Sequence, residues 1–313
     1  MRTRARSRLA LTLSSAAPLL SLAAGACFHA QYQTKPAVAV VEGDPIVQMA
    51  PPAALPSLDN PSYSLWKAHT DPPAPWEPVV GIAGRGYPLG LLDRYEVVND
   101  DSLASHTPYV VTRCPLAGLA AVYDRRIGGR TLTFINSGAL WRDTLVLEDR
   151  ETGTLWTAAT GEALYGPLQG ERLTAIPATI ATMNSYAEAN PRARYLDTGE
   201  LTETSISMAL YNSSGWQGFS GFRTRDARFD PKAKVYSISE GTEALAFVEE
   251  DVKGRGCVAA FLAGRPVLVE WDAERDAPRA FRGSADGSVE IAVVPMYWFA
   301  LDRHFETVRT LGR

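Results

Sequence analysis

Residues 108–123 read PYVVTRCPLAGLAAVY, two β-branched and aliphatic runs that are separated by a proline and a glycine. Short apolar runs bounded by turn residues are typical of β-strands. Residues 131–134 (TLTF) and 144–147 (TLVL) continue the same pattern. This part of the chain is therefore predicted to be rich in β-structure.

The same stretch aligns without gaps to residues 266–281, and Gly86-Tyr87-Pro88 upstream of it aligns to residues 246–248. Each half also ends in an expected helix that contains an aromatic residue, near Tyr186 and near Trp298. Diverged self-similarity of this kind indicates a duplicated structural unit. We expect an α+β, predominantly β fold of two tandem related units, each closing with a helix.

These patterns divide the chain into five segments. They are a signal peptide (1–26), a Pro/Ala-rich tether or arm (27–78), a first β-rich repeat (79–196), a Gly/Ser/aromatic connector (197–232) and a second β-rich repeat (233–313). In the first repeat, Pro88 suits the first turn of a helix that ends near Tyr95. A second helix is expected from about Thr182 to Ala189, because the following Asn190-Pro191 disfavours helical backbone.

The N-terminus contains four arginines, then an apolar run, then Ala24-Gly25-Ala26-Cys27. This order of basic, apolar and small residues is that of a secretory signal peptide. Cys27 also fits the lipid-acceptor position of a bacterial lipoprotein, although Ala24 stands where leucine is usual. We expect an exported lipoprotein in the periplasm or at the outer face of the cytoplasmic membrane, with the membrane as a partner through its N-terminal lipid. A permanent membrane-spanning helix is the alternative, and the serines and proline of the run weaken it.

Composition and charge exclude several classes of protein. With 46% hydrophobic and 21% charged residues, the chain is neither collagen-like, nor a coiled coil, nor wholly disordered. The formal charge of −4 includes the four arginines of the signal, and removing them leaves 27 basic and 35 acidic residues, a charge of −8. This acidic balance argues against a nucleic-acid partner.

The segment from residue 28 to residue 78 contains ten of the 21 prolines. A chain of this composition does not bury enough apolar surface to fold alone. It is expected either to hold the globular part away from the membrane as a tether, or to wrap the domain as an arm. In the second case Tyr63, Leu65 and Trp66 are the expected anchor points.

Several motifs in register resemble a prokaryotic family of mostly exported proteins, domain-of-unknown-function family 3179. The residues that carry the resemblance are Tyr87-Pro88-Leu89, Glu96-Val97-Val98-Asn99-Asp100, Cys114-Pro115-Leu116, Asp149-Arg150-Glu151-Thr152-Gly153, Trp156, Gly161, Gly166-Pro167-Leu168 and Gly170. The resemblance runs from about residue 58 to the C-terminus. No activity is established for this family, so the resemblance implies a relationship and leaves the function open.

Two family motifs are altered in this chain. Members of the family typically have His-Glu before Val-Asn-Asp and Cys-Pro-Leu-Cys-Gly-Thr at the cysteine motif, a set suited to a soft metal or a dithiol. Here Tyr95 replaces the histidine, Ala117 the second cysteine and Leu119 the threonine. Glu96 and Cys114 remain, and one thiol with one carboxylate does not complete a tetrahedral site. We expect no cofactor and no metal at this motif.

Cys114 and Glu96 are nevertheless the candidate catalytic residues, with Cys114 as a nucleophile or reduced thiol. The alternatives for Cys114 are an inert buried thiol and a disulfide with Cys257, the other cysteine of the predicted body. Tyr95, Asn99 and Asp100 are binding candidates beside Glu96, where an acid/base pair or cation site competes with simple turn capping.

Three aromatic residues of the connector, Trp216, Phe219 and Phe222, are further binding candidates. They are expected either to line a ligand or partner surface or to pack the connector onto the sheets. The four histidines of the chain are scattered and show no metal-ligand spacing.

These observations favour an exported, lipid-anchored, non-catalytic binding or accessory subunit of a periplasmic or membrane-associated complex, with a protein partner. Two alternatives remain open. One is a metal- or thiol-dependent redox protein or enzyme that uses a reduced site at Cys114 and Glu96. The other is a periplasmic protein that binds a small molecule in the cleft between the two repeats.

Overall fold

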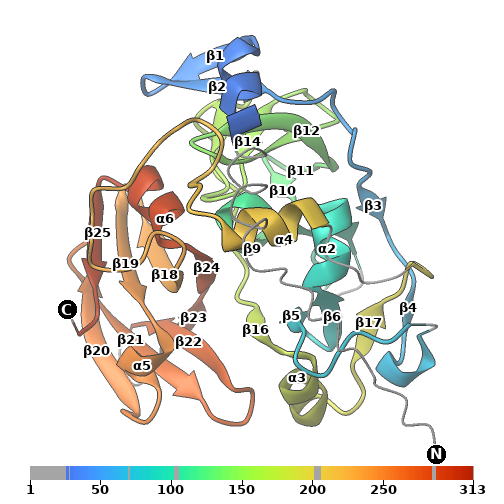
Figure 1. Cartoon of the computed structure of the whole chain (residues 1–313). Helices are drawn as coiled ribbons and strands as arrows, with labels where there is room; N and C mark the ends of the chain where they lie inside the picture. The colour runs from blue at the N-terminus through green and yellow to red at the C-terminus, as the bar shows by residue number, and fades with distance from the viewer. Residues whose placement is uncertain are drawn as a thin grey trace, which may run out of the picture.

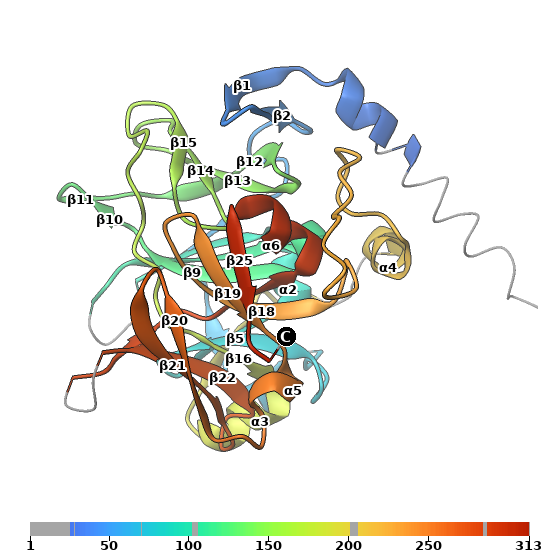
Figure 2. The ribbon, with the colours of Figure 1, turned by 90° about the vertical axis from the view of Figure 1, so that its left-hand side faces the viewer.

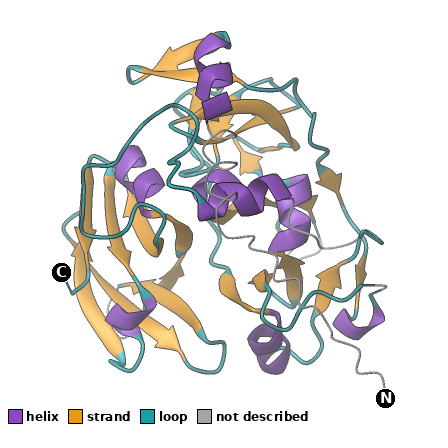
Figure 3. Cartoon of the chain, in the orientation of Figure 1, coloured by secondary structure: helices purple, strands orange, loops and turns teal. Residues whose placement is uncertain are grey.

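The computed structural model describes residues 26–27, 29–69, 71–101, 106–200, 206–283 and 287–312. Small β-sheets dominate it, with short helices between them (Figure 1, Figure 3). The expected α+β, predominantly β fold class is confirmed. Most of the expected signal peptide, residues 1–25, lies outside the described residues. No helix among the described residues is long and apolar enough to cross a membrane.

The first unit is built on a hairpin of β5 (Pro78–Ile82) and β6 (Arg85–Pro88). Strand β16 (Thr179–Thr182) pairs antiparallel with β5, and β17 (Arg194–Leu196) pairs parallel with β6. Helix α3 (Met183–Ala189) connects the two flanking strands. The result is a sheet in the order β16-β5-β6-β17 with one helical crossover, extended at the β17 edge by β4 (Tyr63–Ser64).

The second unit repeats this arrangement. Its hairpin consists of β18 (Lys234–Glu240) and β19 (Glu243–Phe247). Strand β24 (Val294–Tyr297) pairs antiparallel with β18, and β25 (Thr307–Thr310) pairs parallel with β19. The connecting helix α6 (Trp298–His304) takes the place of α3. The two tandem units therefore share one topology, and in each the closing helix is followed by a parallel strand that the sequence did not predict.

Each unit carries a second antiparallel sheet after its hairpin. In the first unit it consists of β7 (Val97–Asp100), β8 (Tyr109–Cys114) and β9 (Leu119–Asp124), with β3 (Leu58–Asp59) at one edge. In the second unit it consists of β20 (Cys257–Leu262), β21 (Arg265–Asp272), β22 (Ala277–Arg282) and β23 (Val289–Ile291). The gap-free alignment places β8 and β9 on β21 and β22, which occupy equivalent positions in the two sheets.

The first unit contains an insertion that the second unit lacks. It comprises β10 (Arg126–Ile127), β11 (Arg130–Thr131), β12 (Phe134–Trp141), β13 (Thr144–Asp149), β14 (Leu155–Thr157) and β15 (Ala163–Tyr165). Apolar side chains of β12–β14 pack against one face of the β7–β9 sheet, and residues of both layers belong to one buried cluster. The opposite face of the β7–β9 sheet packs against the β5–β6 hairpin in a second cluster.

The proline-rich segment forms an arm on the first unit and not a free tether. Strands β1 (Ala37–Val41) and β2 (Asp44–Gln48) form a hairpin, and β2 pairs with β12 at the top of the molecule (Figure 1, Figure 2). Further along, β4 (Tyr63–Ser64) pairs antiparallel with β17. The ring of Trp66, in the short helix η1 (Trp66–Ala68), packs against that of Tyr195, whereas Leu65 is exposed.

The helices follow local signals that the sequence contains. Helix α2 (Leu89–Tyr95) begins after Pro88, and α3 begins where the Thr182 hydroxyl accepts a hydrogen bond from the Ser185 N–H at 3.1 Å. Both were expected. Helix α4 (Ile206–Ser213), in the connector, and the single turn α5 (Glu249–Val252) were not expected. The connector is therefore partly helical.

A buried carboxylate joins the two units to the connector. Asp143, fully buried in the turn between β12 and β13, accepts backbone hydrogen bonds from Phe219 at 2.7 Å and Ser220 at 2.8 Å. It also accepts from the Ser220 hydroxyl and forms an ion pair with Arg303 of α6. Arg303 in turn reaches Asp44 of the arm at 3.2 Å. One carboxylate thus links the insertion, the connector, the second unit and, through Arg303, the arm.

Replacing Asp143 with alanine is expected to destabilise the fold by about 3–5 kcal/mol, because it leaves the nearly buried Arg303 without its main partner. Chemical denaturation monitored by circular dichroism measures this difference. The matched control is Glu162→Ala, which removes a surface ion pair with Arg172 and is expected to change the stability by no more than about 1 kcal/mol. A loss for Asp143→Ala as small as that of the control would contradict the assignment.

Candidate functional site

Glu96 occupies a strained position between α2 and β7. Its backbone adopts the left-handed conformation, with φ of 58°, and its N–H donates to the Leu92 carbonyl at 2.8 Å to end the helix. Non-glycine residues rarely adopt this conformation, and such outliers gather at functional sites. The turn directs the side chain toward β12, where the Asn136 amide donates to the Glu96 carboxylate at 2.7 Å.

The surroundings of Glu96 favour its protonated form. Burial is the main reason that the pKa of its carboxyl is raised to about 8; nearby Asp93 also raises this pKa, whereas Arg113 and the hydrogen bond from Asn136 lower it. Arg113 does not neutralise Glu96 directly, because its Nε donates to Asp93 at 2.8 Å and its Nη1 to the Leu119 carbonyl at 3.1 Å. Near neutral pH the Glu96 side chain can therefore both donate and accept a proton.

Glu96 lines a cavity of about 370 Å³ between α2, the short helix η2 (Pro115–Ala117) and α4. The lining residues are Leu55, Asp93, Arg94, Glu96, Pro115, Leu116 and Met208. Helix α4 is held over η2 by the Tyr211 hydroxyl, which donates to the Leu116 carbonyl at 2.8 Å. The cavity combines apolar walls with one carboxyl group that has no ion-pair partner of its own among the described residues.

Cys114 lies beneath this cavity but does not line it. Its side chain is buried in the cluster between the β7–β9 sheet and β12–β14, and its sulfur accepts a hydrogen bond from the Leu145 N–H at 3.3 Å. Burial, and to a smaller extent the neighbouring Glu96, raises the pKa of its thiol to about 12. The thiolate is the nucleophilic form of cysteine. Cys114 is therefore an inert thiol at neutral pH.

Two of the three substituted motif positions, Tyr95 and Ala117, also do not line the cavity. Tyr95 is buried, and its hydroxyl donates to Glu200 at 2.6 Å. Ala117 is buried in η2 within the same cluster as Cys114. Of the four motif residues Tyr95, Glu96, Cys114 and Ala117, Glu96 is the one that lines the cavity.

Asn99 and Asp100 hold strands together instead of forming an open site. The Asn99 amide donates to the Phe134 carbonyl at 2.8 Å and accepts from the Phe134 N–H at 2.9 Å, which ties β7 to β12. Buried Asp100 accepts hydrogen bonds from the hydroxyls of Tyr87 at 2.5 Å, of Tyr109 at 3.0 Å and of Tyr63 in the arm. Both side chains are committed to these internal contacts.

The three connector aromatics pack against different parts of the molecule. The ring of Trp216 lies 6.0 Å from that of His29, and Phe219 contacts Tyr211 edge to face. The guanidinium of Arg303 lies 4.9 Å above the ring of Phe222. All three are partly buried in these contacts. The sequence allows two roles for these residues, a binding surface or packing of the connector. These contacts are those of packing.

A disulfide between Cys114 and Cys257, one of the alternatives that the sequence leaves open for Cys114, is not formed. Cys27, Cys114 and Cys257 are free thiols in the structure. Cys114 lies in the core of the first unit, whereas Cys257 is exposed at the start of β20 in the second unit. That alternative rested on the expected compartment and not on the positions of the two residues.

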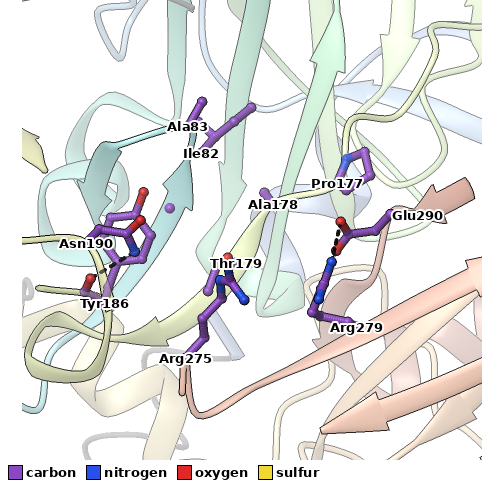
Figure 4. Close-up of a pocket in the computed structure, with 11 residues that line it drawn as sticks. Ile82, Ala83, Pro177, Ala178, Thr179, Tyr186, Asn190, Arg275, Arg279 and Glu290 are labelled. Atoms are coloured by element: carbon purple, nitrogen blue, oxygen red, sulfur yellow. Dashed lines mark hydrogen bonds and ion pairs between the residues drawn. The ribbon is translucent and has the colours of Figure 1, made fainter. Parts of the chain in front are cut away.

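A second cavity, of about 230 Å³, lies between the two units (Figure 4). Arg279 and Glu290 form one wall, paired through two hydrogen bonds of 2.8 and 2.9 Å. Arg275 lies beside Thr179 of β16 in the centre of the view. The sequence suggested a cleft between the repeats but named none of these residues. One signal in the sequence points to Arg279, since the repeat alignment pairs this charged residue with Ala121 of the first unit.

Sequence reasoning also missed most of the wall of the Glu96 cavity. Arg94 and Asp93 precede the motif by two or three positions, and Met208 comes from the unpredicted helix α4. Among the described residues there is no group of three or more His, Cys, Asp or Glu side chains placed to hold a metal ion.

Comparison with known proteins identifies one family. The model of the family described as protein of unknown function (DUF3179) matches residues 52–311, which include both β-rich units. No curated protein and no solved structure matches the chain.

The Glu96→Gln variant tests the raised pKa. The pKa of Glu96 is about 8 in the folded protein and 4.5 ordinarily. Between pH 4.5 and pH 8, the folded protein therefore keeps the Glu96 proton that the unfolded chain releases. Glu96 therefore makes the fold less stable as pH rises through this range. Glutamine does not ionise, so the variant lacks this loss of stability. We expect the free energy of unfolding of the variant, measured relative to that of wild type, to increase from pH 4.5 to pH 8. Denaturation across pH measures it, with exposed Glu188→Gln as control, and equal pH profiles for Glu96→Gln and wild type would refute the prediction.

Thiol accessibility tests the burial of Cys114. In the native protein we expect a maleimide to modify Cys257 but not Cys114, because the Cys114 thiol is enclosed and neutral. After denaturation both are expected to react. Peptide mapping by mass spectrometry assigns the modified positions, with Cys114→Ser as the control for assignment. Rapid native modification of Cys114 would contradict the structure described above.

Proposed function

Because the chain belongs to DUF3179, a family of unknown function, we propose its function from its own residues and geometry. It is an exported, lipid-anchored and non-catalytic binding or accessory subunit of a periplasmic or membrane-associated complex. Its binding site is the cavity over Glu96. A protein partner in the complex, and not a nucleic acid, occupies this site or presents a ligand to it.

This proposal rests on one observation: Glu96 lines the cavity and Cys114 does not. A thiol- or metal-dependent reaction needs the sulfur to reach a substrate or ion. Here the Cys114 sulfur is enclosed by the core and bonded to the Leu145 N–H. The alternative role, a reduced Cys114/Glu96 site, requires an opening of the core that nothing in this arrangement supports.

The cavity retains features of a binding site. Glu96 supplies a carboxyl group at one end, while Leu55, Leu116 and Met208 supply apolar walls. This combination suits an apolar group that carries a hydrogen-bond donor, such as an amine or a basic side chain of a partner. The strained backbone of Glu96 is consistent with a carboxyl group held in place for recognition.

The position of Cys27 supports a short attachment to the membrane. Cys27 is exposed, and two residues later the His29 ring already bonds to the Phe219 carbonyl at 2.9 Å. Gln33 donates to the Ser220 carbonyl at 3.1 Å. Since the arm is docked from His29 onward, a lipid on Cys27 would hold the connector and the arm close to the membrane surface.

A small-molecule binding protein is the second candidate. The polar cavity between the units favours it, because Arg275, Thr179 and the Arg279–Glu290 pair surround a space of about 230 Å³ there. This alternative predicts thermal stabilisation by a small polar ligand, and an Arg275→Ala variant that no longer shows it. The Glu96 cavity is not involved in that effect.

Membrane fractionation tests the principal proposal. Expressed in a bacterial host, the full chain is expected in the membrane fraction with a lipid on Cys27, and Cys27→Ser is expected to move it to the soluble fraction. Cys257→Ser is the matched control and is expected to remain with the membrane. Recovery of the wild-type chain as a free, unlipidated monomer would overturn the proposed anchoring.

Metal analysis of the same preparations tests the non-catalytic assignment. Stoichiometric metal in the wild-type chain that is lost in Cys114→Ser would overturn it. Equal metal content in both proteins, together with an unreactive native Cys114, is the expected result.

A further inference from the structure

Two adjoining cavities lie around the loop 190–194, which connects α3 to β17. One has a volume of about 780 Å³, and we call it the arginine cavity because Arg85, Arg192 and Arg194 line it. The other has a volume of about 490 Å³, and we call it the aromatic cavity because the rings of Trp66 and Tyr195 line it. Three residues of the loop 190–194 line both cavities, so a single ligand can occupy the two together.

The arginine cavity concentrates positive charge. It has three guanidinium groups and no acidic side chain in its wall, although the chain as a whole has a net charge of −4. Arg85 and Arg194 are paired neighbours on the parallel strands β6 and β17, and like charges in such positions destabilise a sheet. Arg192 and Arg194 are exposed and form no ion pair with any residue that the structure describes. An anion bound among the three arginines would relieve this repulsion.

Backbone hydrogen bonds hold the loop that carries these arginines. The Arg194 N–H donates to the Gly84 carbonyl at 2.9 Å, and the Ala193 N–H donates to the Asn190 carbonyl at 2.8 Å. The Asn190 side-chain amide donates to the Tyr186 carbonyl at 3.0 Å. The arginine cavity is therefore formed before a ligand arrives, which lowers the entropic cost of binding.

The aromatic cavity offers a place for a planar ring. The rings of Trp66 and Tyr195 lie 6.4 Å apart, and the exposed side chain of Leu65 adds an apolar wall. Tyr195 is 2% exposed, and its hydroxyl has no hydrogen-bond partner among the described residues. A buried hydroxyl without a partner is unfavourable, and a ligand in this cavity can supply one. The charges of Lys67 and Glu188 at this cavity balance each other.

We propose that the two cavities together bind a soluble organic phosphate. Its phosphate group lies among Arg85, Arg192 and Arg194, and its planar ring lies beside Trp66 and Tyr195. Guanidinium groups bind phosphate through paired, charge-assisted hydrogen bonds, and a phosphate monoester has enough free oxygens for more than one arginine. Aromatic side chains favour stacked or edge-to-face contacts with a ring.

The position of the site favours a free ligand over a membrane headgroup. Both views place α3 at the end of the molecule opposite the β1–β2 hairpin, which follows the proposed anchor Cys27 (Figure 1, Figure 2). Arg275 of the neighbouring cavity between the units is not part of this site, because it is paired with Asp272. The inference uses neither Glu96 nor Cys27 nor Arg275, so it stands independently of the proposed function and of its alternative.

Isothermal titration calorimetry on the full chain in a mild detergent tests the site with phenyl phosphate, inorganic phosphate and phenol. Phenyl phosphate is expected to bind about tenfold more tightly than inorganic phosphate, because it also fills the aromatic cavity. Phenol, which lacks the anion, is expected to bind more weakly than phenyl phosphate. Leu65→Asn is expected to reduce the affinity for phenyl phosphate and to leave that for inorganic phosphate unchanged.

Arginine variants test the phosphate contacts. Arg192→Ala and Arg194→Ala are each expected to weaken phenyl phosphate binding by about tenfold or more, since each removes a charge-assisted hydrogen bond. Both side chains are exposed, so we expect unchanged circular dichroism and melting temperature. The matched control is Arg130→Ala in β11, another exposed arginine without an ion pair among the described residues. It lies far from α3 in both views and is expected to bind as wild type does (Figure 1, Figure 2).

Four results would overturn the proposal. They are no binding of phenyl phosphate to the wild-type chain, equal affinities for phenyl phosphate and inorganic phosphate, equal affinities for phenyl phosphate and phenol, and unchanged binding in both arginine variants. Vesicles of phosphatidic acid and phosphatidylcholine distinguish a free ligand from a headgroup. The Cys27→Ser chain is expected not to sediment with them, and sedimentation that Arg192→Ala abolishes would overturn the assignment to a soluble ligand.

Discussion

The Asp143 carboxylate imposes the constraint on which the arrangement of the units depends. A buried charge is tolerated only when hydrogen bonds and an opposite charge compensate it. Its compensation here comes from the backbone of the connector, the Ser220 hydroxyl and Arg303 of the second unit. Because Arg303 also pairs with Asp44, the arm, the insertion, the connector and α6 have to be in place together. The left-handed backbone of Arg142 and Asp143 presents this carboxylate from a tight hairpin turn.

Much of the fold could be predicted from the sequence because local signals specify it. Pro88 and Thr182 mark helix starts, and the short apolar runs in β8 and β21 indicate both the strands and their duplication. The docking of the arm could not be predicted in this way. Pairing of β2 with β12 joins residues more than ninety positions apart, and no local pattern identifies such a partner. The connector helix α4 was not predicted, because a glycine-rich sequence follows it.

Part of the candidate site could be predicted from the sequence. The substituted motif directed attention to Glu96 and Cys114, and the structure places both in one region. What the sequence could not tell was that Cys114 faces the core while Glu96 turns outward. That difference arises from the positive φ of Glu96 and from the insertion β12–β14 that encloses Cys114. Asn99 and Asp100 were read as a polar turn, but they lie on a buried strand, where their partners come from distant segments.

The parallel strands that complete each unit have a consequence for the order of events during synthesis. The first unit lacks β17 until residue 196 has been made, and the second lacks β25 until residue 310. Strand β25 pairs with β19, more than sixty residues earlier. Contacts this far apart form late, because closing the intervening loop is entropically unfavourable. The second unit therefore completes its sheet only after β25 has been made, and the Arg303 side chain that pairs with Asp143 is made 160 residues after that carboxylate.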